Sequence, residues 1–398
     1  MKQLRSSLLF SLLLLMLSGC RNSPEEGSSS TSTERVGEEA GTLPPREEDF
    51  PSSRFKWGYM DRGGQLAIEA RFDEGREFSE GLAAVRVAGR WGYIDKSGAF
   101  VVPLQFQGAW SFAEGLGRVL SYNNTMGFIN KDGSWAIEAK YEDLLDFKEG
   151  LARVRVEGKY GFIDPAGRLA IPAQYERASS FEHGYSKVRQ GSGYGLIDRE
   201  GKVVLAPEYN KVAPFSEGLA RVRREGLFGF VDRSGQPVIP LRFENAQDFN
   251  EGLAPVKENG LYGLIDRSGA FVVPPGYGQI WYAGASCWGV ETEGLYGLID
   301  AEGKVLFSPQ FEQVFSFENG FAPYRLGRLW GYLDEEGGLL TQPQFGLAWA
   351  FREGLARVAT RKGIGFINTS GELSIPPKAE FIDLRDFSEG LAPVQVYR

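Results

Sequence analysis

A repeat of about 34 residues runs through most of this 398-residue chain. Each copy has an aromatic or bulky residue followed by Gly, then Asp or Asn four positions after that residue and a second Gly seven positions after it. The ten anchor residues are Trp57, Trp91, Met126, Tyr160, Tyr194, Phe228, Tyr262, Tyr296, Trp330 and Ile364. A fixed period of this length indicates small structural units that stack on one another.

The chemistry of each copy predicts β-strands joined by tight turns. In Asp/Asn-x-x-Gly, the side chain accepts a backbone N–H and Gly adopts positive φ without steric cost. Segments such as "LARVRV" alternate apolar and polar residues, which is typical of a strand with one buried face. Each unit is therefore predicted to be a three-stranded antiparallel meander. The remaining third, such as "AQYERASSF", is interpreted as a connection that packs on the meander.

The units could assemble in two ways. One meander is too small to close a core, so neighbours must stack. A second recurring aromatic is predicted to form the core between units: Phe72, Phe106, Tyr141, Tyr175, Tyr209, Phe243, Tyr277, Phe311, Phe345 and Phe381. We predict an all-β fold in which the ten units form an open superhelical array.

The alternative is a β-propeller. The chain ends on "EGLAPVQVYR", a strand that the first unit lacks, so the two ends could complete one blade. Propellers usually have four to eight blades of four strands, and ten units of three strands favour the open array.

The first residues have the pattern of a targeting segment. A basic start precedes an apolar run at residues 8–17, which is shorter than the roughly 20 residues that a membrane-spanning helix needs. Residues 1–19 are therefore predicted to be a signal peptide. The following "LSGC" resembles the lipobox of bacterial lipoproteins, which implies lipidation of Cys20; an ordinary secretory signal is the alternative. Because an acylated Cys20 could not pair with Cys287, no structural disulfide is expected.

The predicted domain organisation follows from composition. Residues 20–53 contain eight acidic residues and almost no large apolar ones, so they are predicted to form a disordered acidic and Ser-rich tether. Residues 54–398 contain the β-array. The residue after the cysteine, Arg21, differs from the Asp that retains some lipoproteins in the inner membrane. The resemblance therefore implies a lipid-anchored protein of the bacterial cell envelope, at the outer membrane or cell surface rather than the inner membrane.

The repeat itself resembles the WG-repeat family, also called KWG repeats. The stretches "FKWGYMD", "RWGYID", "LWGYLD" and "FSEGLAPV" carry the resemblance, which covers about residues 54–398. Most copies replace Trp with Tyr, Phe, Met or Ile, which favours a packing role for this residue. The family supplies no catalytic residues, and it implies a bacterial repeat protein with interaction roles.

The composition argues against catalysis, cofactors and nucleic-acid binding. The single histidine, His183, occupies the place of a recurring Glu, and no nucleophile motif accompanies it. One His and one unlipidated Cys do not make a zinc site of the usual type, and the turns lack the acids of a calcium loop. The net charge of −8, with scattered basic residues, argues against a nucleic-acid surface. We predict no catalytic residues, no metal and no cofactor.

The seventh unit departs from the repeat and is the candidate binding patch. Where other copies read Phe-x-Glu-Gly-Leu-Ala, it has "AGASCW", and Tyr277, Trp281, Tyr282 and Trp288 lie within twelve residues. These aromatics either fill space left by the missing core residues or form a binding site, because Trp and Tyr are enriched at binding hot spots.

Three classes of function remain for the whole chain, and the third, an enzyme, is disfavoured because no catalytic motif is present. The first is a lipid-anchored interaction scaffold with an unknown protein or glycan partner. The second is a carbohydrate or cell-wall binding protein whose aromatic side chains stack on sugar rings.

Overall fold

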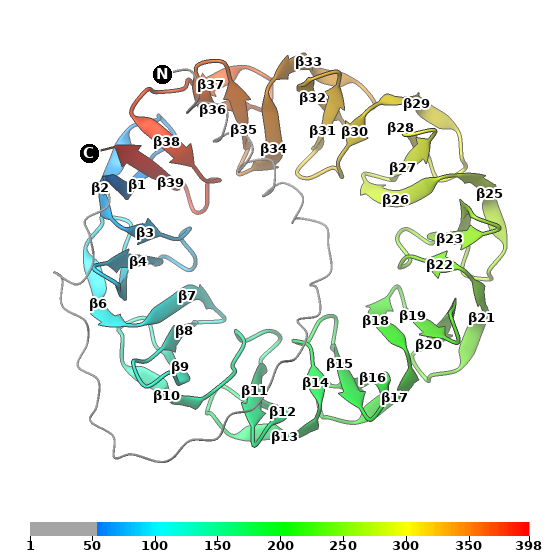
Figure 1. Ribbon diagram of the computed structural model, residues 1–398, viewed down its shortest axis with the longest axis horizontal. Helices are drawn as coiled ribbons and strands as arrows, with labels where there is room; N and C mark the ends of the chain where they lie inside the picture. The colour runs from blue at the N-terminus through cyan, green and yellow to red at the C-terminus, as the bar shows by residue number, and fades with distance from the viewer. Residues whose placement is uncertain (1–53, 398) are drawn as a thin grey trace, which may run out of the picture. The chain divides into compact units, whose positions relative to one another are not determined.

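Ten antiparallel sheets surround a central opening in the computed structural model, which describes residues 54–397 (Figure 1). The sheets are the blades of a β-propeller, and in each blade the chain runs from the innermost strand outward. Within the described range, no helix has the length and apolar character needed to cross a membrane.

We number the blades along the ring and name their strands from the inside outward. Blade 1 contains β38 (Phe381–Leu384), β39 (Ala392–Tyr397), β1 (Phe55–Met60) and β2 (Leu66–Phe72). Blades 2 to 4 contain β3 (Glu74–Gly75), β4 (Ala83–Val87), β5 (Arg90–Ile94) and β6 (Phe100–Phe106); β7 (Gly108–Ala113), β8 (Leu116–Leu120), β9 (Met126–Ile129) and β10 (Trp135–Tyr141); and β11 (Ala152–Val156), β12 (Lys159–Ile163) and β13 (Leu169–Tyr175). In blade 4 an isolated bridge between Leu144 and Val154 takes the place of the innermost strand.

The remaining blades follow the same order. Blades 5 to 7 contain β14 (Arg177–Ala178), β15 (Tyr185–Gln190), β16 (Gly193–Asp198) and β17 (Val203–Tyr209); β18 (Lys211–Ser216), β19 (Leu219–Arg224), β20 (Leu227–Asp232) and β21 (Pro237–Phe243); and β22 (Asn245–Ala246), β23 (Ala254–Glu258), β24 (Leu261–Ile265) and β25 (Phe271–Tyr277). Blades 8 to 10 contain β26 (Gln279–Gly284), β27 (Cys287–Thr292), β28 (Leu295–Ile299) and β29 (Val305–Phe311); β30 (Gln313–Val314), β31 (Phe321–Leu326), β32 (Leu329–Asp334) and β33 (Leu339–Phe345); and β34 (Leu347–Arg352), β35 (Leu355–Thr360), β36 (Gly363–Asn368) and β37 (Leu373–Ile375).

The ring is closed by strands from the two ends of the described chain. β1 pairs with β39 along its whole length, from Phe55 opposite Tyr397 to Met60 opposite Ala392. The start of the array supplies the two outer strands of blade 1, and its end supplies the two inner ones. The predicted open superhelical array is therefore wrong, and the alternative, a β-propeller, is the fold.

The prediction of three-stranded units is also wrong. The segment interpreted as a connection forms the innermost strand, as β18 does in blade 6. The innermost strands are short or bulged, with a register shift between Val212 and Phe215 in β18, so they lack a long alternating pattern. Their place in the sheet depends on pairing with the second strand, which local periodicity does not reveal.

The anchor motif holds the third and fourth strands close together. A Cβ on Gly161 would lie 2.6 Å from the carbonyl oxygen of Ile171 on the neighbouring strand, so no side chain fits there. Four of the ten anchors, Trp57, Trp91, Phe228 and Trp330, are only 6–7% exposed, and the other six are partly exposed and pack against the core. This burial agrees with the packing role expected for the Trp position.

Aromatic rings fill the spaces between blades. Eight of the ten recurring aromatics predicted to form this core are buried, while Tyr277 and Phe381 are partly exposed. A second aromatic layer lies nearer the centre, where Phe181 of blade 5 meets Phe162 of blade 4 with ring centroids 4.8 Å apart. Adjacent blades therefore share one continuous apolar interface.

The turn between the third and fourth strands gives a first prediction. Gly167 has φ +74°, and a Cβ there would lie 3.2 Å from a methyl carbon of Ile137 in the preceding blade. Gly167→Val should lower the free energy of unfolding by about 1–3 kcal/mol, because a β-branched residue is strained at this φ. Asp164→Asn should leave it nearly unchanged at neutral pH, since Asn368 makes the same turn. Urea unfolding of both variants tests this, and the reverse order of stability would contradict it.

The turn carboxylates give a second prediction, on acid stability. Hydrogen bonds, above all from the side chains of Ser97, Arg168, Ser234 and Ser268, lower the pKa values of Asp95, Asp164, Asp232 and Asp266 respectively. A pKa that is lower in the folded chain than in the unfolded one contributes stability above the ordinary Asp value of about 3.9. That contribution is lost as the pH falls through the folded pKa.

We therefore expect the melting temperature to fall between about pH 4 and pH 2. A variant with Asn at all four positions should lose less over that range, because its turns no longer titrate. Thermal unfolding followed by circular dichroism measures both slopes, and equal slopes would contradict the prediction.

Candidate binding surface on the inner wall of the ring

The inner wall consists of the two innermost strands of each blade, which surround the central opening (Figure 1). One face of the ring carries the turns between first and second strands, which contain the Phe-x-Glu-Gly motif; we call it the glutamate face. The other face carries the turns between second and third strands, and we call it the distal face.

A chain of hydrogen bonds connects the blades on the glutamate face. Glu114 has φ 51°, and its carboxylate accepts hydrogen bonds from the backbone N–H groups of Glu149 and Gly150 in the next blade, at 2.6 and 2.9 Å. The same bond from a Gly N–H to the preceding Glu recurs elsewhere around the ring, for the pairs Gly81–Glu389, Gly115–Glu80, Gly184–Glu149, Gly252–Glu217 and Gly390–Glu353. Each bond offsets the strain of the left-handed Glu. The sequence showed the motif without showing that it joins neighbouring blades.

Nearer the centre of the ring, Arg side chains of the second strand contact the next blade. Arg221 donates to the carboxylate of Asp248 at 3.0 Å and also to the carbonyl of Ala246. Arg118 makes the same pair of contacts with Asp146 and Leu144, and Arg357 with Asp386 and Leu384. Charge-assisted bonds of this kind are stronger than neutral ones, so these Arg side chains fix the angle between adjacent blades.

The ten blades differ widely at one position of the innermost strand. The residues there, from blade 2 around to blade 1, are Arg76, Trp110, Leu145, Ser179, Ala213, Gln247, Trp281, Phe315, Trp349 and Arg385. All except Ala213 are partly exposed. The residues that the copies share are therefore used for packing and turns, whereas this position of the inner wall has seven residue types among the ten blades.

Three residues of the predicted binding patch lie in this wall, in blade 8, and the fourth, Tyr277, lies at the end of the outermost strand of blade 7. Tyr277 is the last residue of β25, Trp281 and Tyr282 lie on β26, and Trp288 lies on β27. Tyr277, Trp281 and Tyr282 are partly exposed, whereas Trp288 is 0% exposed. The Tyr282 hydroxyl donates to the Glu251 carboxylate at 2.6 Å. Burial is the main cause, and this hydrogen bond the second, that raises the pKa of Tyr282 to about 12.

Trp288 replaces a missing core residue. Most blades pair a Phe on the first strand with Ala or Gly on the second, as in Phe215 opposite Ala220. Blade 8 reverses the sizes, with Ala283 at the Phe position and Trp288 at the Ala position. The Trp288 ring packs between blades 7 and 8 against Leu264 and Ile280.

Trp281 differs from the other two Trp residues at its repeat position. The guanidinium carbons of Arg118 and Arg357 lie 4.1 and 4.6 Å from the ring centroids of Trp110 and Trp349. In blade 8 the residue in place of this Arg is Gly289, and the Trp281 ring lies so close that a Cβ on Gly289 would clash with it at 2.1 Å. Trp281 therefore has no covering guanidinium and packs edge-on against Tyr296.

The other residues singled out by sequence are His183 and the two cysteines. His183 is exposed and has φ 54°, as the Glu residues it replaces do. Cys287 is buried with a free thiol, and Cys20 lies outside the described residues. Among residues 54–397, no group of three or more His, Cys, Asp and Glu side chains is placed to hold a metal ion.

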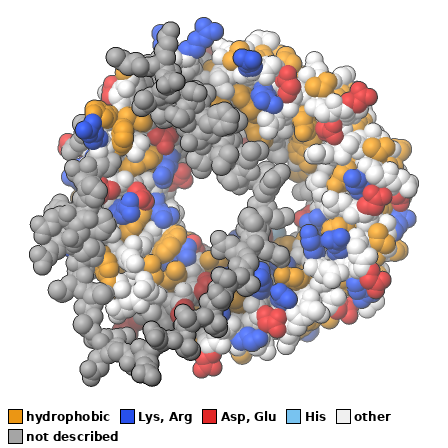
Figure 2. Space-filling view, viewed as in Figure 1, with side chains coloured by type: hydrophobic (Ala, Val, Ile, Leu, Met, Phe, Trp, Pro, Cys, Tyr) orange, Lys and Arg blue, Asp and Glu red, His pale blue; other side chains and the backbone are white. Residues whose placement is uncertain are grey.

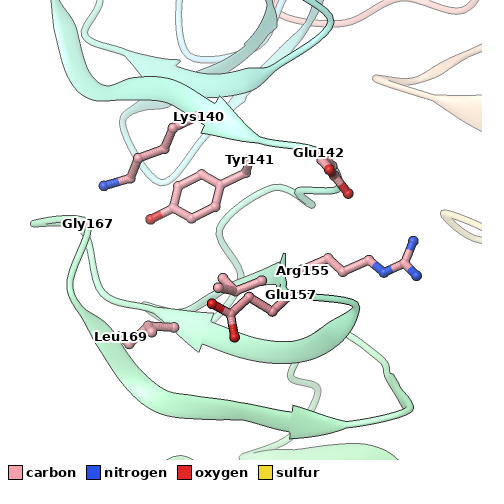
Figure 3. A pocket seen from close by; sticks show the side chains of 8 residues that line it. Lys140, Tyr141, Glu142, Arg155, Glu157, Gly167 and Leu169 are labelled. Atoms are coloured by element: carbon pink, nitrogen blue, oxygen red, sulfur yellow. The ribbon is translucent and has the colours of Figure 1, made fainter. Parts of the chain in front are cut away.

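A cleft of about 450 Å³ lies between blades 3 and 4. Its lining includes Lys140 and Glu142 on one side and Arg155 and Glu157 on the other, with Tyr141 between them (Figure 3). Basic and acidic side chains are balanced there, so the cleft does not favour a ligand of either charge.

The repeat was compared with models of known protein families. The model described as "WG containing repeat" matches ten consecutive segments: residues 57–91, 91–124, 126–160, 160–193, 194–228, 228–262, 262–282, 296–330, 330–361 and 364–397. The chain belongs to the WG-containing repeat family. The resemblance carried by "WGYID" and related stretches is thereby confirmed, and in this chain ten WG repeats close into one propeller.

The WG repeats were also compared with individual proteins, and no curated protein matched. Several solved structures are similar to the chain. The crystal structure of a eukaryotic initiation factor is 12% identical, with 81% of this chain and 95% of that chain covered and a TM-score of 0.42. BamB from Moraxella catarrhalis is 12% identical, with coverages of 72% and 95% and a TM-score of 0.37. The extracellular domain of BT3049 from B. thetaiotaomicron is 10% identical, with coverages of 79% and 54% and a TM-score of 0.24.

Proposed function

We propose that this WG-repeat propeller is a non-catalytic interaction scaffold of the bacterial cell envelope, attached to a membrane by a lipid on Cys20. One observation carries the scaffold proposal: the ten repeats agree in their packing residues and differ on the exposed inner wall. A wall whose side chains vary around the ring suits recognition of one partner in one orientation. If the repeats had only a structural role, the differences between them would not need to gather on the inner wall.

Capture of partners from envelope extract tests the scaffold proposal. The variant Glu77→Arg, Ser111→Arg, Ser316→Arg places three bulky cations on the innermost segments of blades 2, 3 and 9. The matched control, Glu138→Arg, Gln174→Arg, Gln344→Arg, adds the same residues on outer strands, where the three originals are exposed. The partners held by the wild-type chain should be lost from the inner-wall variant and kept by the control. Equal capture by both variants would contradict the proposal.

The lipid anchor has its own test. The lipobox-like "LSGC" and the acidic segment that follows it support attachment through Cys20. Wild-type cells labelled with a radioactive fatty acid should yield a labelled protein in the membrane fraction. Cys20→Ser should abolish the label and release the protein or leave its precursor uncleaved, while Cys287→Ser should change neither. An unlabelled wild-type protein would refute the anchor.

Carbohydrate binding is the second candidate function, and Trp281 is the observation that favours it. This partly exposed ring lacks the guanidinium that covers Trp110 and Trp349, so a sugar ring could stack on it. Binding of soluble cell-wall glycan strands should weaken in Trp281→Ala and persist in Trp110→Ala. Melting temperatures measured for both variants separate lost binding from lost folding.

A further inference from the structure

Two neighbouring blades carry pairs of like charges on the inner wall. Arg177 lies directly opposite Arg189 in blade 5, and Lys211 lies directly opposite Arg223 in blade 6. Side chains at such paired positions have Cβ atoms about 4.5–5.5 Å apart, and like charges there destabilise a sheet. Both pairs stand at the distal end of the two innermost strands. The two members of each pair repel each other, and Arg189 and Arg223 also donate to the nearby carbonyl oxygens of Gly191 and Gly226.

Among residues 54–397, the pairs at the same register position in other blades do not combine two like charges. Blade 2 has Glu74 opposite Arg86, and these two form an ion pair. Several further blades hold at most one charged residue there, as in Gly108–Leu120, Asn245–Lys257, Gln279–Glu291, Gln313–Arg325, Leu347–Ala359 and Asp383–Gln395. The like-charged pairs of blades 5 and 6 are therefore a local departure from the repeat.

A third cation joins the two pairs. Lys187 of β15 is partly buried beside the ring of Tyr194, with its ammonium 5.8 Å from the ring centroid. Burial lowers the pKa of Lys187, and the charges of Arg221 and Lys211 lower it further. Lys187 therefore lies within electrostatic reach of the basic side chains of blade 6.

Few acids compensate this charge. Arg189 has a long ion pair, 3.8 Å, with exposed Glu176, and Arg221 is paired with Asp248. For Arg177, Lys187, Lys211 and Arg223, no acid among residues 54–397 lies within 4.0 Å. Lys and Arg side chains gather along the lower right edge of the central opening in Figure 2, near where Figure 1 places β14 and β18.

We propose that this sector, defined by Arg177, Lys187, Arg189, Lys211 and Arg223, binds an anion that carries two or more phosphate groups. A phosphate group has a charge of about −2 and three acceptor oxygens, so one group can neutralise both members of a like-charged pair. A carboxylate carries a charge of −1 and would leave half of each pair uncompensated. Guanidinium groups also match phosphate with paired hydrogen bonds.

This inference rests on the proposed binding function and assigns a ligand class to one sector of the inner wall. The probe is inorganic tripolyphosphate, titrated calorimetrically into the full chain in detergent at low salt. Arg177→Gln, Lys211→Gln removes one cation from each pair and should weaken binding at least tenfold. The matched control, Arg199→Gln, Lys202→Gln, removes two exposed cations from the third–fourth turn of blade 5 and should bind as the wild type does.

Further measurements keep the proposal falsifiable. Without the probe, at low salt, Arg177→Gln, Lys211→Gln should melt at or above the wild-type temperature, because repulsion is removed; a lower melting temperature would mean that the pairs are structural. If the wild type bound neither tripolyphosphate nor vesicles containing phosphatidic acid, the proposal would be overturned. Equally tight binding of polyglutamate of the same charge would also overturn it. Binding to the vesicles alone would identify a lipid as the phosphate source. The partners captured by the wild type should not depend on tripolyphosphate, so this proposal can fail while the scaffold stands.

Discussion

Deletion of residues 392–398, which removes β39, should unfold the propeller. β1 would lose the six residues with which it pairs, and the core would lose Val394, which is 0% exposed. The ring would open at blade 1, where β38 would lose the strand with which it pairs and the β1–β2 hairpin would expose an edge. We expect the free energy of unfolding to fall by more than about 5 kcal/mol, beyond the usual range for single substitutions. Urea unfolding followed by circular dichroism measures the loss.

Two control chains separate closure from mere shortening. Deletion of only Tyr397 and Arg398 should cost about 1 kcal/mol or less, because the Tyr397 side chain is 54% exposed. A circular permutant with new ends between Glu225 and Gly226, and the old ends of the propeller linked, should melt near the wild-type temperature. Its blade 6 would then be closed by strands from both ends, as blade 1 now is. A deletion lacking β39 that melts like the wild type would show that the closed ring is not needed for stability.

Trp288→Ala should be the most destabilising single substitution in blade 8. The side chain is fully buried between blades 7 and 8, and truncation of a buried Trp typically costs about 3–5 kcal/mol. Because the residue is buried, the loss should appear in the free energy of unfolding and not as a selective loss of ligand binding. Urea unfolding of the variant measures it.

A second substitution tests whether Trp288 stands in for the missing Phe. Adding Ala283→Phe to Trp288→Ala restores the Phe and Ala arrangement of the other blades, as in Phe351 opposite Ala356. The double variant should recover more than half of the lost stability, whereas Ala283→Phe alone should overpack the interface and destabilise the chain. If the double variant were less stable than Trp288→Ala, the exchange of sizes across these strands would be ruled out.

The local structure of the repeat could be predicted because neighbouring residues determine it. Asp164 and Gly167 make their turn through a side chain that bonds the adjacent backbone and a residue that accepts positive φ. Gly161 keeps the strand pair close, and Trp91 has the apolar surface that drives its burial. The period, the hairpins and most of the core aromatics follow from interactions within a few residues of one another.

The candidate site could be predicted only in part. Its aromatic members were visible as a break in the repeat, but whether each lies in the core or on the wall depends on the opposite strand. Trp288 is buried because Ala283 leaves room for it, and Trp281 is partly exposed beside Gly289. The like-charged pairs of blades 5 and 6 were not visible, because Arg177 and Arg189 become neighbours only through the register of β14 and β15.

The period of the repeat, its turns and the residues available for its core were therefore predictable from local sequence. The fourth strand of each unit and the closure of the ring became evident from the three-dimensional fold. Closure depends on the angle between blades, which is set by side chains that reach across the gap, such as Arg221 to Asp248. The rotation from one blade to the next adds up over the ten interfaces and brings β1 beside β39. Pairing between residues more than 300 positions apart leaves no pattern within a single repeat. A ring and an open array would therefore have the same repeat and would differ only in geometry.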